Sequence, residues 1–244
     1  SPVTGWMASI AKAAGFAALL RIFFAAFASH DVDWAPIVGV LAVITLVIGA
    51  VMAILQTDVK RMLAFSSVSH AGYVLVAVHA ASADGTSAAL FYLFTYTIMV
   101  LGTFAVVGAM GTDDEHPLSR YAGLGRSRPV LALGFTVLLF AQAGIPVTSG
   151  FIAKFQVIAA AVNNESYFIA GAAMMTAVIG AFMYLRIVMV MYVTDEEEER
   201  TSRTWHWTTS TVVIAAVGFT ILAGVVPQFL IEFAEDAVPI LIRG

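Results

Sequence analysis

The sequence predicts an all-α membrane protein with about seven transmembrane helices, one of them broken near its middle. The chain is 60% hydrophobic and only 11% charged, whereas soluble domains carry about 25% charged residues. Its mean hydropathy is +0.91. The apolar residues also gather into stretches that are each long enough for the roughly 20 residues that a helix needs to cross a bilayer. Together these observations exclude an ordinary soluble domain.

The expected helices follow one another along the chain. We place them at residues 4–28, 36–56, 61–81, 86–110, 129–162, 166–193 and 207–230. The longest contains AGIPVTSG, from Ala143 to Gly150, near its middle. Pro146 removes a backbone donor, and the glycines and Thr148 weaken the helix further. We therefore predict one broken helix in this stretch, and two helices joined by a tight turn are the alternative.

The arginines and lysines of the loops predict the orientation in the membrane. The second, fourth and sixth loops share one side and hold Lys60, Arg61, Arg120, Arg126, Arg128, Arg200 and Arg203. The other side holds only Arg243. Because short basic loops stay in the cytoplasm, we expect the N-terminus to be cytoplasmic and the C-terminus to be outside. The acidic run at residues 195–199 then also lies on the cytoplasmic side, as a solvated loop.

Two of the three lysines lie inside apolar stretches, where a charge is costly. Lys154 is the only charged residue between Pro129 and Asn164, and Lys12 lies within WMASIAKAAGFAALL. A charge at the centre of a bilayer costs about 2.5–3.5 kcal/mol on insertion scales. Burial also disfavours the charged form of an amine, so that a buried lysine can lose and regain a proton. The two lysines therefore indicate proton movement through a membrane.

Several common kinds of site are absent from the sequence. There are no cysteines, which excludes disulfides and thiolate-held iron–sulfur clusters. No GxGxxG or GKS/T phosphate loop occurs, and the five histidines show no metal-ligand spacing. The net charge of −4 and the scattered basic residues argue against nucleic acid as a partner.

Four segments resemble a known family of membrane subunits. LQTDVKRMLAFSSVSHAGYVLVAV (Leu55 to Val78) and AGIPVTSGFIAKF (Ala143 to Phe155) resemble the antiporter-like subunits of respiratory complex I. In that family, subunits of the L and M type carry a lysine near the position of Val100, and FYLFTYTIMVLGTFAVV (Phe91 to Val107) has none. This segment and LSRYAGLGRSRP (Leu118 to Pro129) resemble subunit N of NADH:quinone oxidoreductase.

The resemblance implies a fold and a domain organisation. Family members contain two inverted five-helix repeats, each with a broken helix, and about twice as many helices as this chain. Residues 1–30 would then hold the helix that closes a first repeat missing from this chain. Residues 34–193 would form the second inverted repeat, with its broken helix at 129–162, and residues 207–244 would add a flanking helix and a tail. We therefore expect the chain, which starts without an initiator methionine, to be the C-terminal half of such a subunit.

The resemblance also implies proton-transfer roles for four residues. Lys12 matches the family's central lysine, and Lys154 matches the lysine of the broken helix, which is associated with proton exit to the outside. Lys60 and His70 match polar positions between the second loop and the helix that follows it. The family's first repeat supplies a glutamate and another lysine, and neither is present here. We therefore do not expect this chain alone to hold a complete proton path.

The cofactors and partners that the resemblance implies lie outside the chain. NADH, FMN, iron–sulfur clusters and quinone would be bound by partner subunits, and we expect no cofactor or metal on this chain. Its partners would be the other membrane subunits of complex I, the missing N-terminal half and the lipid bilayer. The expected location is a bacterial inner membrane.

Each candidate residue also has a simpler structural interpretation. Lys12 or Lys154 could snorkel toward the membrane surface, and Lys60, beside Arg61, could merely fix the topology. His70 could bond a neighbouring helix. A structural or packing role is also the simpler interpretation for three further residues, Arg186, Tyr92 and Tyr96.

Three functions remain in view at this stage. The first is a proton-pumping subunit of complex I that performs no redox chemistry itself. The second is a subunit of a multisubunit cation/proton antiporter, and the third is a passive membrane scaffold. The missing lysine near Val100 favours the first over the second. Buried lysines on two separate helices argue against the third.

Overall fold

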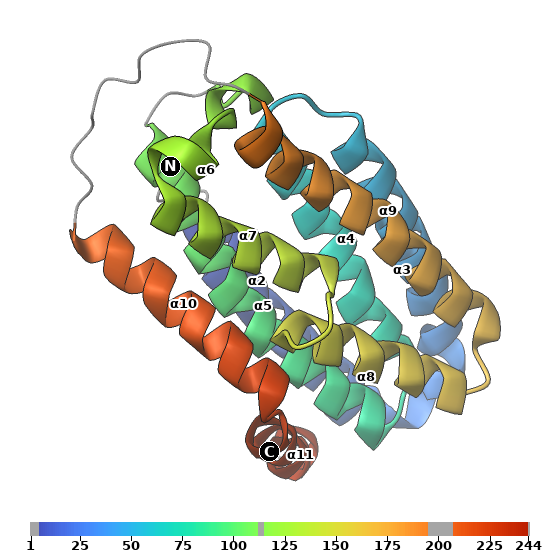
Figure 1. Cartoon of the computed structure of the whole chain (residues 1–244). Coiled ribbons are helices and arrows are strands. Elements are labelled where there is room, and N and C mark those ends of the chain that lie inside the picture. The colour runs from blue at the N-terminus through green and yellow to red at the C-terminus, as the bar shows by residue number, and fades with distance from the viewer. Residues whose placement is uncertain (1–4, 112–114, 195–206, 244) are drawn as a thin grey trace.

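The computed structural model describes residues 5–111, 115–194 and 207–243. These residues are almost entirely helical, and Figure 1 shows the helices side by side in one elongated bundle. The main helices are α2 (Lys12–Arg21), α3 (Asp31–Ile54), α4 (Val59–His79), α5 (Ala83–Met110), α6 (Leu124–Ser127), α7 (Pro129–Ala143), α8 (Ser149–Asn163), α9 (Tyr167–Val193), α10 (Trp207–Val225) and α11 (Gln228–Arg243). The predicted all-α class is confirmed.

The described part of the chain is a multi-pass membrane protein. Six helical segments are each long and apolar enough to cross a membrane, namely Met7–Ala26, Ala28–Ile54, α4, α5, α9 and α10. The first of these has a π-helical turn on each side of α2: η1 (Met7–Ala11) precedes it and η2 (Ile22–Ala26) follows it. A single-turn π-helix often marks a functional position, and Lys12 directly follows η1.

The seventh crossing is the broken helix that the sequence predicts. At 1.5 Å per residue, each 15-residue half is only about 22 Å long, too short to cross a core of about 30 Å alone. Figure 1 shows α8 continuing away from α7 across the bundle, so the two halves do not form a hairpin. Gly144 ends α7 with a left-handed φ of 87°, and Pro146 lies between the halves.

The connections gather at the two ends of the bundle as the sequence analysis expects. At one end, the α3–α4 loop pairs with the α5–α7 connection: the Leu118 N–H donates to the Thr57 carbonyl at 3.0 Å. At the other end, His79 at the end of α4 is hydrogen-bonded to Ser166 before α9 at 2.9 Å. Arg200, Arg203 and the acidic run at 195–199 lie outside the described residues. The side of the membrane that each end faces stays a prediction.

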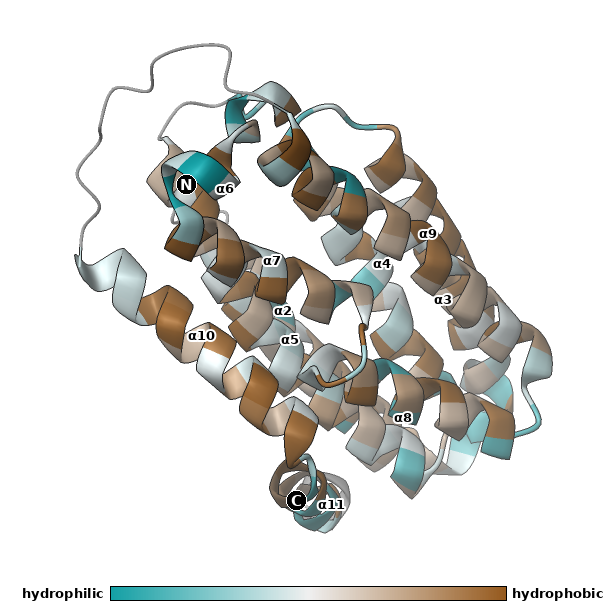
Figure 2. Ribbon diagram, viewed as in Figure 1, coloured by the Kyte–Doolittle hydropathy of each residue, from teal (hydrophilic) through white to brown (hydrophobic). Residues whose placement is uncertain are grey.

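Helices α4 and α5 form the centre of the bundle, and many of the polar side chains of the interior lie on them. These two helices are the most buried of the spans. Figure 2 shows hydrophobic colour along most of α3, α9 and α10, which surround them. The buried polar residues on α4 and α5 are Ser66, Ser67, Ser69, His70, Thr86, Ser87, Thr95 and Thr103. The membrane-facing surface is thus apolar, and polar groups are kept for the interior.

The end of the chain differs from the expectation. The sequence analysis expects one span to residue 230 followed by a tail, but α10 ends at Val225 and a separate helix, α11, begins at Gln228. Pro227 between them has no backbone N–H to continue α10. Leu230, Ala234 and Val238 form the buried face of α11, four residues apart. Figure 1 shows α11 end-on, below the end of α10.

Candidate functional site

Lys154 lies at the break between α7 and α8 and is buried in protein. Its side chain is 7% exposed. Its Nζ donates to the Gln142 carbonyl and to the Ala143 carbonyl, both at 2.8 Å. These are among the last carbonyls of α7, which have no partner within a helix that stops there. The break therefore creates the acceptors that hold the ammonium group, and Lys154 does not point into lipid.

Two further features shape the surroundings of Lys154. A Cβ added at Gly144 would lie 2.9 Å from the lysine Cδ, so the glycine leaves the space that the side chain occupies. The ammonium also lies over the Tyr73 ring, 5.1 Å from its centroid, within the range of a cation–π contact. Carbonyl oxygens and an aromatic face thus stabilise the charged form without a carboxylate.

Lys12 is held in a similar way on the other side of α4. Its Nζ donates to the Ser67 hydroxyl at 2.8 Å and also to the Ser67 carbonyl. It lies over the Tyr96 ring at 4.9 Å from the centroid. The side chain is half-buried. Snorkelling is therefore not the role of Lys12 in this structure, because its ammonium contacts the helices α4 and α5.

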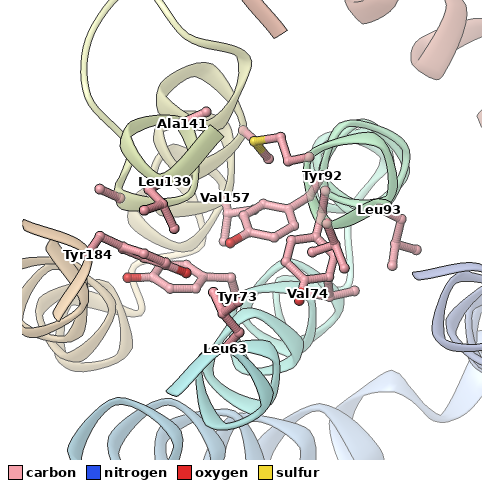
Figure 3. Packing of buried hydrophobic residues seen from close by; sticks show 14 of the residues in the cluster. Leu63, Tyr73, Val74, Tyr92, Leu93, Leu139, Ala141, Val157 and Tyr184 are labelled. Carbon is pink, nitrogen blue, oxygen red and sulfur yellow. The ribbon is translucent and has the colours of Figure 1, made fainter. Parts of the chain in front are cut away.

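His70 lies between the two lysines. Its ring stacks on Tyr96, with the centroids 4.6 Å apart. Its Nδ1 is hydrogen-bonded to the Tyr92 hydroxyl at 2.7 Å, and its Nε2 to the Tyr184 hydroxyl at 3.1 Å. Figure 3 shows Tyr73, Tyr92 and Tyr184 directed toward one another from different helices. His70 thus contacts both α5 and α9 through hydroxyl groups that can give or take a proton.

The contacts continue from His70 to Lys154. The Tyr184 hydroxyl is also hydrogen-bonded to Ser66, and it donates to Gln142 Oε1 at 3.4 Å. The carbonyl of the same glutamine accepts from Lys154. A chain of contacts therefore joins Lys12, Tyr96, His70, Tyr184, Gln142 and Lys154, and we call this set the buried relay. A cavity of about 10 Å³, close to the size needed for one water molecule, lies beside Ser66, His70, Lys154 and Tyr184.

Lys60 is not part of the buried relay. It is the second residue of α4, ten residues before His70, which is about 15 Å along a helix. Its neighbourhood is the loop end of the bundle, where its charge acts on His116. Of the four residues proposed from the resemblance, the structure brings together Lys12, His70 and Lys154 and leaves Lys60 at a distance.

Near Lys60, hydrogen bonds join the α3–α4 loop to the α5–α7 connection, and we call this set of bonds the loop contact. Asp58 caps α4 by accepting from the Arg61 N–H at 3.0 Å, and its other carboxylate oxygen accepts from the His116 N–H. The Val59 N–H donates back to the His116 carbonyl at 2.8 Å. Burial, with the charges of Lys60 and Arg120 acting in the same direction and Asp58 against them, lowers the pKa of His116 to about 4.

Arg186 has the structural role that the sequence analysis weighs. Its guanidinium donates to the Ile54 and Gln56 carbonyls at 3.3 and 3.2 Å. Ile54 ends α3 and Gln56 lies two residues beyond it, so the guanidinium sits at a helix C-terminus, where helical partners are lacking and a cation is favourable. In the described residues there is no group of three or more His, Cys, Asp or Glu side chains that could hold a metal ion.

Sequence reasoning missed Gln142 and Tyr184, and it favoured packing over contact with a water chain as the role of Tyr92 and Tyr96. One signal was available for Gln142, because it is one of only two glutamines in the mostly apolar stretch from Pro129 to Val162. No pattern in the sequence indicated Tyr184, since its contact with His70 joins residues 114 positions apart.

The chain matches known proteins over most of its length. Residues 1–180 match the family model described as NADH:quinone oxidoreductase/Mrp antiporter, transmembrane. NADH-quinone oxidoreductase subunit N of Salinispora arenicola is 44% identical over 97% of this chain and 46% of its own length. The subunit N of Trichlorobacter lovleyi is 39% identical over 99% of this chain and 50% of its own length. The chain therefore spans about half the length of these curated relatives.

Solved structures agree with the sequence matches. A chain of respiratory complex I from Thermus thermophilus, with bound aureothin, has a TM-score of 0.73 and 28% identity over 81% of this chain and 45% of that one. A chain of the Mrp complex from Dietzia has a TM-score of 0.84 at 22% identity, over 92% of this chain and 50% of that one, which shows a shared fold. The chain belongs to the NADH:quinone oxidoreductase/Mrp antiporter transmembrane family.

Proposed function

We propose that this chain belongs to a proton-translocating membrane subunit of an NADH:quinone oxidoreductase, of the subunit N type. The observation that carries the proposal is the buried relay, a continuous set of contacts between the half-buried Lys12 and the buried Lys154, which lie on different helices. A passive scaffold has no need for two ammonium groups inside the bundle, because each costs about 2.5–3.5 kcal/mol to insert. The 44% identical relative is named as subunit N, which supports the choice.

In the proposed mechanism, Lys12 and Lys154 alternate between charged and neutral forms. The two carbonyls at the break stabilise the ammonium of Lys154, while burial disfavours its charge. Because these effects oppose each other, a change of only about 1.4 kcal/mol in the surroundings alters the ratio of the two forms tenfold. Protons pass between the lysines through His70, the tyrosine hydroxyls and water at the cavity beside them. Lys60, far along α4, would act only at the loop end.

The remaining parts of the proposal concern the whole subunit. Residues 34–193 form its second inverted repeat, residues 1–30 the helix that closes the first, and residues 207–244 the flanking segment. The subunit lies in a bacterial inner membrane, with the loop end that holds Lys60 facing the cytoplasm. NADH, FMN, iron–sulfur clusters and quinone are bound by partner subunits, and quinone reduction there drives the proton cycle here.

A multisubunit cation/proton antiporter is the alternative, and the test must separate the two. The full-length gene is deleted in its host and then restored by complementation. We expect the deletion to abolish or strongly reduce proton uptake driven by NADH and quinone in membrane vesicles, and complementation to restore it. Sodium–proton exchange driven by an imposed gradient should be unchanged. Loss of that exchange with intact NADH-driven uptake would contradict the proposal and support the antiporter.

A further inference from the structure

Gln142, in the last turn of α7, has a side-chain amide whose orientation is fixed by its neighbours. It is 2% exposed. Its Nε2 donates to the Thr103 hydroxyl oxygen at 2.7 Å and to the Leu138 carbonyl at 3.3 Å. A carbonyl can only accept, and the Thr103 hydroxyl already donates to the Met99 carbonyl at 2.8 Å. The nitrogen must therefore face these two groups, which directs the amide oxygen toward Tyr184.

The Tyr184 hydroxyl has one proton and three neighbours that compete for it. They are Gln142 Oε1 at 3.4 Å, His70 Nε2 at 3.1 Å and the Ser66 hydroxyl. Of these, only the amide oxygen is always an acceptor. When His70 carries a proton on both ring nitrogens, each nitrogen donates. The Tyr184 oxygen then accepts from His70, and its own proton is directed to Gln142 or to Ser66.

The same glutamine also contacts the lysine of the break. Its backbone carbonyl accepts from Lys154 Nζ at 2.8 Å, while its side chain accepts from Tyr184. An amide does not itself gain or lose a proton near neutral pH, so Gln142 can set the direction of the contacts without carrying a proton. Gln142 is therefore suited to link the protonation state of His70 with the hydrogen bond that holds the Lys154 ammonium.

We propose that Gln142 is a positioning residue of the buried relay, which directs the hydrogen bonds so that His70 donates from Nε2 to Tyr184 and Tyr184 donates to the amide. This inference rests on the proposed proton-translocating function. The titratable groups around His70 are Tyr73 on its own helix, Tyr92 and Tyr96 on α5, Tyr184 on α9, Lys154 on α8 and Lys12 at the start of α2. In the described part of the chain no carboxylate is among them, and the amide oxygen is the acceptor of Tyr184 that cannot become a donor.

The test compares two changes at Gln142 in the full-length subunit of the respiratory complex, with opposite expected effects. Gln142→Leu keeps approximately the size but removes the acceptor for Tyr184, together with the two hydrogen bonds that the amide nitrogen donates to Thr103 and Leu138. The hydrogen bonds that favour protonated His70 then lose their last acceptor. We expect the alkaline limb of NADH-driven proton uptake to move to lower pH, by about half a pH unit to one pH unit for the lost hydrogen bond between Tyr184 and the amide oxygen. Gln142→Glu keeps the shape and adds a charge that favours protons nearby, so the same limb should move to higher pH.

Two controls keep the result specific. Gln156→Leu makes the same change on α8, at a glutamine whose amide oxygen is buried and without a hydrogen-bond partner in the described structure, and its profile should match the wild type. Lys154→Arg tests the underlying function: if this variant pumps normally, the proposed function fails whatever Gln142 does. If Gln142→Leu lowers the rate with an unshifted profile, or if both Gln142 variants move the limb in one direction, Gln142 has only a structural role. Should Gln142→Leu fail to assemble, the shift in Gln142→Glu decides alone.

Discussion

Gly150, near the start of α8, packs closely against the end of α7. A Cβ added there would lie 1.8 Å from the Ala141 carbonyl oxygen and 3.4 Å from the Met99 sulfur. The backbone oxygen cannot move without shifting α7, whose last carbonyls hold Lys154. The geometry of the lysine site thus depends on a position without a side chain.

The first prediction concerns this glycine. Gly150→Ala should destabilise the subunit by about 1–3 kcal/mol or more, because the added methyl overlaps backbone atoms. The measurement is the thermal unfolding midpoint and yield of the assembled complex. Gly171→Ala is the matched control, since a Cβ at that helical glycine meets nothing within 4 Å. Equal stability of the two variants would contradict this account of the break.

At the residue scale, the sequence indicated the charged members of the site but not the neutral ones. Lys12 and Lys154 were identifiable because a charge in an apolar stretch has a physical cost that needs a reason. Gln142 and Tyr184 carry a smaller cost, since they are neutral and can hydrogen-bond a neighbouring helix. Their importance arises only from contacts between distant helices, which no spacing in the sequence encodes. Lys60 shows the converse, because the resemblance implied a proton-transfer role for a charged residue that lies at the loop end, about 15 Å along α4 from His70.

At the scale of elements, the broken helix followed from local chemistry, whereas the end of the chain did not. Pro146 and the glycines predicted the interruption, and α7 and α8 confirm it. The sequence analysis treated residues after 230 as a tail, although Pro227 divides two helices there. The reason is that α11 is amphipathic and too short for a span, so a search for long apolar stretches does not detect it.

The second prediction concerns the loop contact between the α3–α4 loop and the α5–α7 connection. His116 has a pKa of about 4 in the folded protein and about 6.5 in an unfolded chain. The unfolded form therefore binds more protons between these two pH values. The loop contact is then fully stable above about pH 6.5 and weakens as the pH falls toward 4. Hydrogen exchange of the backbone near His116, corrected for intrinsic rates, should speed up in this window.

A variant provides the control for that pH dependence. His116→Asn keeps the backbone N–H that donates to Asp58 but removes the titrating ring. Exchange in this variant should be faster at pH 7 and nearly independent of pH between 6.5 and 4. If the corrected exchange of the wild-type loop does not change between pH 6.5 and 4, His116 does not control the stability of the loop contact.

At the scale of the whole molecule, the connections are sorted between the two ends of the bundle, and their basic residues predict the orientation. The third prediction follows from this. In the cysteine-free chain, Ser119→Cys should react with a membrane-impermeant reagent only from the cytoplasmic side, and Asn163→Cys only from outside. Both positions are exposed, and the parts of the chain that hold them, the connection just before α6 and the end of α8, lie at opposite ends of the bundle (Figure 1). Labelling from the reversed sides would invert the proposed topology.

The central claim is that Lys154 moves protons by gaining and losing its own charge. The most direct measurement is the number of protons moved per electron, with NADH:quinone activity, in assembled complexes that carry Lys154→Arg or Lys154→Met. Arginine keeps the charge but does not deprotonate in proteins, and methionine cannot take a proton. The account predicts that proton movement falls in both variants, with electron transfer falling alongside it if the two are tightly coupled. Wild-type pumping in Lys154→Arg would contradict the claim, because a permanently charged residue cannot cycle its proton.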